Sequence, residues 1–67
     1  MDFLRKKIGY KITVILKNNE ARYTGKLLCY DINMNLALDK VHKESGNFNR
    51  GLGKTLIRGN NILFIIL

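Results

Sequence analysis

The stretch EARYTGKLLCYD, residues 20–31, has a glycine in the middle of a segment whose composition is otherwise typical of one long β-strand. An interior glycine weakens a strand unless the backbone has to bend sharply at that point. We therefore predict that Gly25 is a bend, which lets a single strand contribute to two sides of a small barrel.

The segments on either side of this stretch predict one short helix and four more strands. Apolar residues at helical spacing begin after Asp2 and end at Gly9, so the helix has about two turns at most. The pairs Asn18–Asn19 and Asn60–Asn61 are turn signals, because asparagine tolerates positive φ. The predicted strands are 10–17, 20–31, 36–44, 54–59 and 62–67, with a tight loop at 32–35 and a polar, glycine-rich loop at 45–53. The predicted fold class is mostly β: a short N-terminal helix followed by a strongly bent, five-stranded antiparallel barrel.

The last predicted strand, ILFIIL at 62–67, is apolar on both faces. Strict alternation would place Ile62, Phe64 and Ile66 together on one of these faces. Such a strand must be covered on both faces, and a chain of 67 residues is too small to supply two covers. An uncovered apolar edge would also promote aggregation. We therefore expect other chains to pair here; the alternative is that one face packs on the N-terminal helix and the other is exposed.

Composition limits how the chain can be stabilised. The sequence is one domain, and Cys29 is its only cysteine, so no disulfide can form within it. We predict that Cys29 is a small buried hydrophobe. One Cys and one His cannot complete a four-ligand zinc shell, so we expect no metal and no other cofactor. A single thiol fits a reducing compartment. With no apolar run near the roughly 18 residues of a spanning helix and no signal-peptide pattern, we expect a soluble intracellular protein with no membrane partner.

Charge favours nucleic acid as a partner. The net charge is +7, from 12 basic and 5 acidic residues, and such an excess attracts polyanions.

Catalysis is not expected. GLGKT at 51–55 hints at a phosphate-binding loop, but the full pattern needs a glycine where the chain has Phe48. No carboxylate pair and no nucleophile with a partner base is recognisable, so we expect neither an enzyme nor a small-molecule substrate.

Two motifs together resemble the Sm and Sm-like family. The first, within about 9–44, combines Gly25 with D-x-x-M-N-L at 31–36; the second, within 54–67, contains LIRGNNI at 56–62. The segment 45–53 falls where the family has a variable loop. The resemblance covers nearly the whole chain and implies a single Sm domain over residues 1–67, which is a small barrel of the SH3-like or OB-like kind.

The resemblance also implies assembly. Family members form rings, usually of seven subunits, in which the fourth strand of one subunit pairs with the fifth strand of the next. That agrees with the independent argument from the last strand. The implied interface residues are Leu56, Ile57, Ile62, Leu63, Phe64, Ile65 and Ile66.

In this family each subunit offers a pocket for one base of a uridine-rich single strand. The implied RNA-binding residues are Asn33, Met34, Asn35, Arg58, Gly59 and Asn60, with Asp31 supporting the loop. Asn35 would read the edge of uracil, since an amide offers both a donor and an acceptor. Arg58 would stack on one face of the base. Gly59 would allow close approach of the backbone, Asn60 would support Asn35 or contact the base, and Asp31 would accept backbone N–H bonds.

One residue of the loop departs from the family pattern, and a purely structural role for the loop asparagines stays open. Where many members carry an aromatic residue or His that stacks on the second face of the base, this chain has Asn33. The pocket could therefore be weak, unless Tyr30 or Met34 compensates; Met34 is interpreted mainly as a core residue. Without the second motif, Asn33 and Asn35 would be read as ordinary turn residues.

Arg58-Gly59-Asn60 and the short helix are most similar to the G-type branch of the family, which belongs to spliceosomal cores. This resemblance implies a subunit of a heteroheptameric ring on small nuclear RNA, located in the nucleus with a cytoplasmic assembly stage. One alternative is an Sm-like subunit in messenger RNA decay or U6 RNA binding. Another is a mainly structural assembly subunit.

Overall fold

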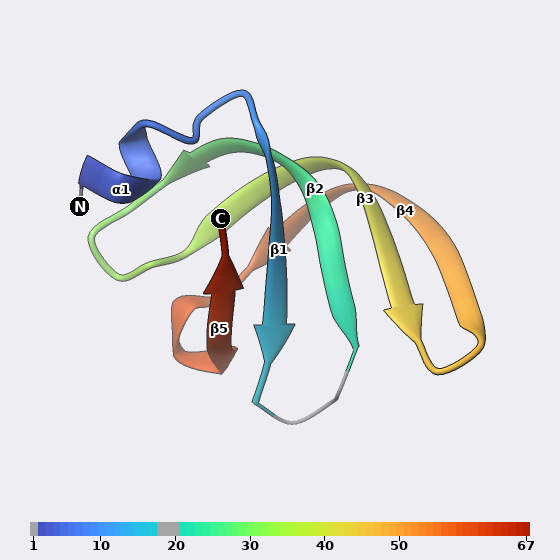
Figure 1. The fold of residues 1–67 in the computed structure, drawn as a ribbon. Coiled ribbons are helices and arrows are strands. Elements are labelled where there is room, and N and C mark those ends of the chain that lie inside the picture. Colours follow the sequence, from blue (N-terminus) through green and yellow to red (C-terminus); the bar gives the residue numbers. More distant parts are fainter. Residues whose placement is uncertain (1, 18–20) are drawn as a thin grey trace.

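The computed structural model describes residues 2–17 and 21–67 and has five antiparallel strands and one short helix (Figure 1). The predicted turn at Asn18–Asn19 and the first residue of the predicted second strand lie outside these residues. The elements are α1 (Asp2–Arg5), β1 (Lys11–Leu16), β2 (Arg22–Tyr30), β3 (Leu36–Ser45), β4 (Phe48–Ile57), the 3-10 helix η1 (Gly59–Asn61) and β5 (Ile62–Ile66).

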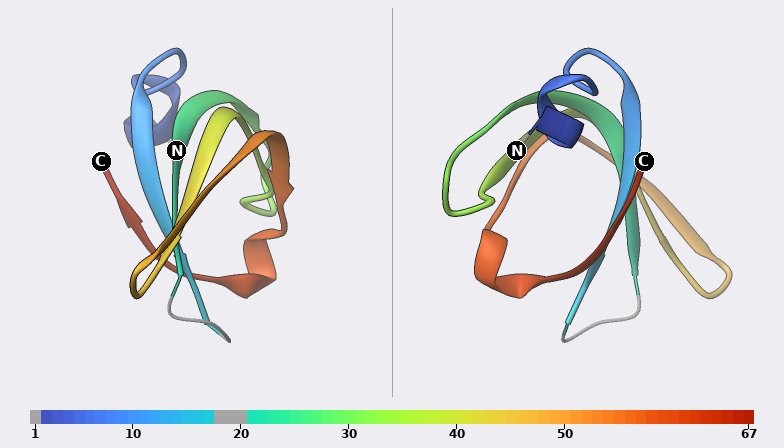
Figure 2. Two further views of the ribbon diagram at one scale, coloured as in Figure 1. Left: turned by 90° about the vertical axis from the view of Figure 1, so that its right-hand side faces the viewer. Right: turned by 60° about the vertical axis from the view of Figure 1, so that its left-hand side comes forward.

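The strands form one sheet in the order β4-β3-β2-β1-β5. The sheet curls into an open barrel, with α1 across one end of the curl (Figure 2). The predicted fold class is therefore confirmed. Because β4 and β5 stand at the two ends of the order, each of them leaves one backbone edge without a partner strand in the described chain.

The helix is shorter than predicted. It covers a single turn, and hydrogen-bonded turns carry the chain to Gly9, whose φ is 89°. The Lys7 N–H donates to the Leu4 carbonyl at 2.9 Å, and the Gly9 N–H donates to the Leu27 carbonyl at 2.8 Å. So short a helix is unstable alone, but Leu4 is fully buried in the core and attaches α1 to the sheet. None of the helices in the described residues is long and apolar enough to cross a membrane.

Gly25 behaves as the sequence predicts. A Cβ at this position would lie 2.8 Å from the Asp39 carbonyl oxygen and 2.8 Å from Val41 Cγ2 on β3. The pairing of β2 with β3 gains one extra residue of β3 at this point, and Lys40 there has a φ of 49°. The bend thus depends on a glycine in β2 facing a bulge in β3, which lets the two strands approach closely.

The core lies inside the curl. Its buried apolar residues are Leu4, Ile12, Val14, Ala21, Tyr23, Leu27, Leu36, Leu38, Val41 and Ile57. The prediction that Cys29 is buried was wrong, because the thiol is exposed. A register shift between Leu27 and Cys29 interrupts the alternation that would have pointed Cys29 inward.

The glycine-rich segment 45–53 was predicted as a loop, and that prediction was wrong. Only Gly46 and Asn47 connect β3 to β4, and Ser45 pairs with Phe48 across the turn. Gly46 has a φ of 60°, which suits the first central position of a tight hairpin turn. The two strands therefore extend beyond the barrel as a ribbon, seen at the right of Figure 1. Polar composition suggested a loop, but cross-strand pairing formed a hairpin.

The last strand also differs in detail from strict alternation. β5 pairs with β1 through Ile15↔Phe64 and Leu16↔Ile62, so Leu63 is an extra residue and forms a bulge. As a consequence, Ile62 and Ile65 both pack partly against the core, whereas Leu63, Phe64 and Ile66 are exposed.

Candidate functional site

The turn between β2 and β3 is organised by one carboxylate. Asp31 Oδ1 accepts the backbone N–H of Asn33 at 2.9 Å and that of Asn35 at 3.0 Å. The Asp31 carbonyl accepts the Met34 N–H at 3.0 Å, and Met34 has a φ of 63°. Asp31 therefore folds the loop by accepting backbone N–H bonds, as predicted.

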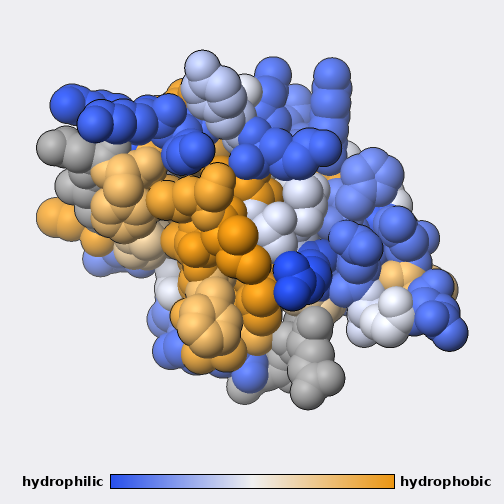
Figure 3. All heavy atoms as spheres, viewed as in Figure 1, coloured by the Kyte–Doolittle hydropathy of each residue, from blue (hydrophilic) through white to orange (hydrophobic). Residues whose placement is uncertain are grey.

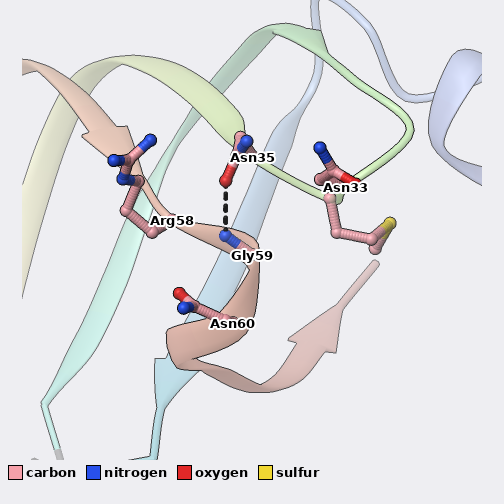
Figure 4. Close-up of a pocket in the computed structure, with 6 residues that line it drawn as sticks. Asn33, Asn35, Arg58, Gly59 and Asn60 are labelled. Atoms are coloured by element: carbon pink, nitrogen blue, oxygen red, sulfur yellow. Dashed lines mark hydrogen bonds between the residues drawn. The ribbon is translucent and has the colours of Figure 1, made fainter.

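The Asn35 side chain joins this loop to the start of η1. Its Nδ2 donates to Asp31 Oδ2 at 2.9 Å, and its Oδ1 accepts the backbone N–H of Gly59 at 2.8 Å (Figure 4). Both ends of the amide are thus held by groups of opposite hydrogen-bonding character. One N–H and one lone pair of Asn35 remain for a ligand.

Gly59 is required because two backbones meet there. A Cβ at this position would overlap the Asn33 carbonyl oxygen and would lie 2.8 Å from the Met34 carbonyl carbon. Any other residue would force the 31–35 loop away from η1. The sequence argument expected Gly59 to allow close approach, and the partner that approaches in the structure is the neighbouring loop.

An open cavity of about 520 Å³ lies between this loop and η1. Its lining residues are Asn33, Met34, Asn35, Arg58, Gly59 and Asn60. The structure therefore brings together all six residues named from the sequence as RNA-binding. Figure 4 shows their side chains coming from two segments far apart in the sequence.

Electrostatics favours the ionised form of Asp31, whose hydrogen-bond partner Asn35 lines this cavity. The side-chain hydrogen bond from Asn35 lowers the pKa of the Asp31 carboxyl below its ordinary value, with further lowering from the backbone N–H bonds and from the positive charge of Arg58. The exposed Arg58 guanidinium is the cation among the lining residues, so it can attract an anionic ligand.

Two details of the predicted roles are different. The partners of the Asn35 amide in the described residues are Asp31 and Gly59, not Asn60. Tyr30 does not line the cavity, so it is not placed to replace the missing aromatic residue at Asn33. Met34 lines the cavity and also packs partly against the core.

A second, smaller cavity of about 230 Å³ was not anticipated from the sequence. It is lined by Cys29, Tyr30, Asp31, Asn35, Leu36, Ala37, Leu56, Ile57 and Arg58. It shares Asn35 and Arg58 with the first cavity and lies beside the end of β4. Nothing in the sequence indicated this cavity, because Cys29, which lines it, was expected to be buried in the core.

The predicted interface residues fall into two groups. Leu56 on β4 is 79% exposed, and Phe64 on β5 is 58% exposed. The side chain of Ile57, by contrast, is buried in the core of its own chain, so only its backbone could contact a partner. Apolar surface gathers in the centre of the view in Figure 3, where Figure 1 shows β5. Both open edges of the sheet therefore carry exposed apolar side chains.

Residues 2–67 match the model of the LSM domain family. A putative snRNP Sm-like protein of Thermococcus sibiricus is 41% identical over 97% of this chain and 86% of its own length. The LSM complex subunit lsm6 of Schizosaccharomyces pombe is 38% identical over 96% of this chain and 85% of its own length.

Solved structures agree with these relatives. A heptameric archaeal Sm protein superposes with a TM-score of 0.92 at 27% identity, covering 98% of this chain and 96% of its own. The Sm protein of Pyrococcus abyssii in complex with a uridine heptamer superposes with a TM-score of 0.88 at 30% identity, covering 97% and 92%. A chain of the NatC complex bound to CoA superposes with a TM-score of 0.88 at 28% identity, covering 96% and 82%.

Proposed function

Because the chain belongs to the Sm and Sm-like family, whose mark is the LSM domain, we propose that it is a non-enzymatic RNA-binding subunit of an Sm-type ring. The ring would encircle a uridine-rich single strand and hold one base in the cavity of each subunit. The observation that carries this proposal is the Asn35 amide, fixed between Asp31 and Gly59 at the rim of a cavity that also contains Arg58.

The geometry of Asn35 suits uracil. Uracil offers one donor, N3–H, and carbonyl acceptors beside it, and Asn35 retains one lone pair and one N–H. Since Asp31 and Gly59 fix which end of the amide is oxygen, these two groups are presented in one arrangement only. Arg58 would stack on a face of the base and draw in phosphate. Asn33 would contribute less stacking than an aromatic ring, which is worth about 1–3 kcal/mol per base.

Substitutions at the cavity test this function. We expect Asn35→Ala and Arg58→Ala each to weaken binding to oligouridine by about fivefold or more, because one hydrogen-bonding edge or one stacking plane is removed. Ring assembly, followed by native mass spectrometry, should be unchanged. The matched control is Lys54→Ala, which removes an exposed cation from β4 outside the cavity. If assembly collapsed while RNA affinity per ring stayed the same, the proposed roles would be wrong.

Two kinds of ring are candidates. The G-type resemblance of Arg58-Gly59-Asn60 supports a spliceosomal core on small nuclear RNA, whereas relatives named U6 snRNA-associated Sm-like protein LSm6 support a U6-binding ring; one of these, from Neosartorya fischeri, is 41% identical over 94% of this chain and 79% of its own length. A nuclear location, with a cytoplasmic assembly stage, belongs to the proposal in either form. Mixing the purified chain with candidate neighbours would separate the two, since ring identity is set by all of the members.

A mainly structural role is the second candidate function. It is supported by the similarity to a chain of the NatC complex bound to CoA, which shows this fold in a complex whose named ligand is not RNA. In this role, Asn33 would mark a cavity that holds no base. Crosslinking of photoactivatable uridine to the 31–35 loop distinguishes the candidates. We expect the crosslink, and its absence in a fully assembled complex would favour the structural role.

A further inference from the structure

The ribbon is the outer part of the β3–β4 hairpin, in which residues 42–45 pair with residues 48–51. One face of this ribbon is basic and aromatic. Lys43 lies directly opposite Arg50, and Ser45 lies opposite Phe48. Because residues two apart in a strand share a face, Lys43, Phe48 and Arg50 lie on the same face of the ribbon. We call these three residues the ribbon face.

The two cations of the ribbon face oppose each other. Like charges directly across two strands are destabilising, and the acid of the ribbon, Glu44, alternates onto the other face, opposite Arg22 and Asn49. Lys43 is held in position, since its Nζ lies 5.6 Å from the centroid of the Tyr23 ring. A phosphate group placed between Lys43 and Arg50 would relieve their repulsion.

Phe48 adds an aromatic surface next to these cations. The side chain of Phe48 is 61% exposed. Nearer the barrel, the same face of the sheet is covered by the core, and Tyr23, the partner of Lys43 on β2, is buried there. Proteins bind single-stranded nucleic acids with this combination of an exposed aromatic ring and nearby basic side chains: a base stacks on the ring, and the phosphates contact the cations.

The ribbon face also remains accessible in a ring of the proposed kind. β4 has ten residues and β5 has five, so pairing β4 with the β5 of a neighbouring subunit can engage only half of β4. Leu56 and Ile57 lie at the inner end of β4, and Phe48 lies at the outer end. None of the three ribbon-face residues lines the cavity.

We propose that the ribbon face is a second binding site for single-stranded RNA, separate from the base cavity. A phosphate lies between Lys43 and Arg50, and a base stacks on Phe48. The inference rests on the proposed function in one respect only, namely that the ligand is RNA. It predicts that a long strand contacts the protein at two places, whereas a short oligonucleotide in the cavity contacts it at one.

Variants of the full-length chain, in the oligomeric state in which it purifies, test this site with a short and a long oligouridine. We expect Phe48→Ala and Phe48→Leu to weaken binding of the long strand by at least about fivefold, and Phe48→Tyr to retain it, because stacking needs a ring. Arg50→Gln should also lower the slope of log affinity against log salt by about 0.7, the value for one phosphate contact on a single strand. Binding of the short strand should be unchanged in all four variants.

Lys54→Gln is the matched control for charge. Lys54 is an exposed cation on the same strand as Arg50. Its neighbours Gly53 and Thr55 pair with the buried residues Val41 and Leu38, so they lie on the core face of the sheet. Lys54 therefore lies on the other face of the sheet, away from the ribbon face. We expect its salt slope to equal that of the unmodified chain. If Lys54→Gln lowered the salt slope as much as Arg50→Gln does, the slope would report only the general charge of the chain, and the proposed ribbon site would be wrong. If Phe48→Leu bound the long strand as tightly as the unmodified chain does, stacking on Phe48 would be excluded and the proposal would also be wrong; Phe48 would then be an apolar contact for protein.

The two proposals fail in different ways. If the long strand lost affinity in Asn35→Ala but not in Phe48→Ala, the ribbon site would be wrong and the cavity would stand. If photoactivatable uridine crosslinked to Phe48 but never to the 31–35 loop, the cavity function would be wrong and the ribbon site would stand.

Discussion

Asn35 is restrained at both ends of its amide, and this decides what the cavity can present. If the amide turned over, Nδ2 would face the Gly59 N–H and Oδ1 would face the Asp31 carboxylate, so both hydrogen bonds would be replaced by repulsion. The backbone N–H bonds that Asp31 accepts were predicted from its place in the loop, whereas its bond to the Asn35 side chain was not, because Asn60 was the expected partner of that amide. The Gly59 N–H could not be predicted, because it lies 24 residues away and its position depends on how η1 meets the loop.

Binding of oligouridine should depend on pH through Asp31. The pKa of this carboxyl is lowered in the folded chain, chiefly by the hydrogen bond from Asn35, so the carboxylate form is the one that the loop favours. Its contribution is fully present above the ordinary Asp value of about 3.9 and is lost as the pH falls through the lowered pKa. Affinity should therefore stay level from neutral pH to about pH 4 and decrease below it. Fluorescence anisotropy at a series of pH values measures this.

Asp31→Asn should remove that dependence and should bind more weakly than the unmodified chain at about pH 4 and above, since the asparagine amide cannot accept the same set of hydrogen bonds. Asp39→Asn is the control, because the Asp39 carboxylate accepts the backbone N–H of Lys40 at 2.9 Å and lies outside the 31–35 loop. It should keep the acid decrease of the unmodified chain. A decrease that persisted unchanged in Asp31→Asn would assign the pH effect to another group.

Among the elements, the position of edge strand β5 was predicted correctly from the sequence, whereas the start of edge strand β4 was not. The apolar character of β5 was evident from ILFIIL, and the strand forms where it was expected. Its alternation was not predictable, because the bulge at Leu63 arises from pairing with β1. β4 was predicted to start at 54 and starts at Phe48, because glycine and asparagine suggested a loop whereas β3 supplied a partner strand over the whole segment.

Phe64 should be important for assembly and unimportant for the fold of one chain. Phe64→Lys places a charge on a side chain that is already 58% exposed, so the circular dichroism spectrum should be unchanged. Burying a phenylalanine contributes about 1.5–3 kcal/mol, so subunit association should weaken about tenfold or more. Native mass spectrometry over a range of concentrations measures the change. The control Tyr10→Lys alters a side chain that is 65% exposed and that does not belong to β5. Equal weakening by this control would contradict the role of Phe64.

The whole molecule has two open edges and a small core, so we expect association with other subunits to contribute to its stability. A domain of this size buries only about 60% of its unfolded surface, and the sheet order leaves β4 and β5 at its ends. The fold class could be predicted because the strands, the bend at Gly25 and the turns each have a local signal. The open edges could be inferred only from the unusual last strand, since sheet order is a property of the folded chain.

Thermal stability should therefore depend on protein concentration. Anything that binds only the folded state raises its stability by mass action, and a neighbouring subunit acts in this way. We expect the melting temperature to fall on dilution, together with the fraction of oligomer seen by light scattering. A folded monomer in dilute solution with an unchanged melting temperature would contradict the assembly argument.

The two edges of the sheet are different surfaces, which gives any closed assembly a direction. Joining the β4 side of one copy to the β5 side of the next is a head-to-tail contact, and repeating it by rotation alone turns every copy the same way up. All copies of α1 would then face one side of the opening, and the other side would have a different lining. A strand threaded through such a ring would pass two unlike entrances, so its 5′-to-3′ sense would be distinguished by the protein.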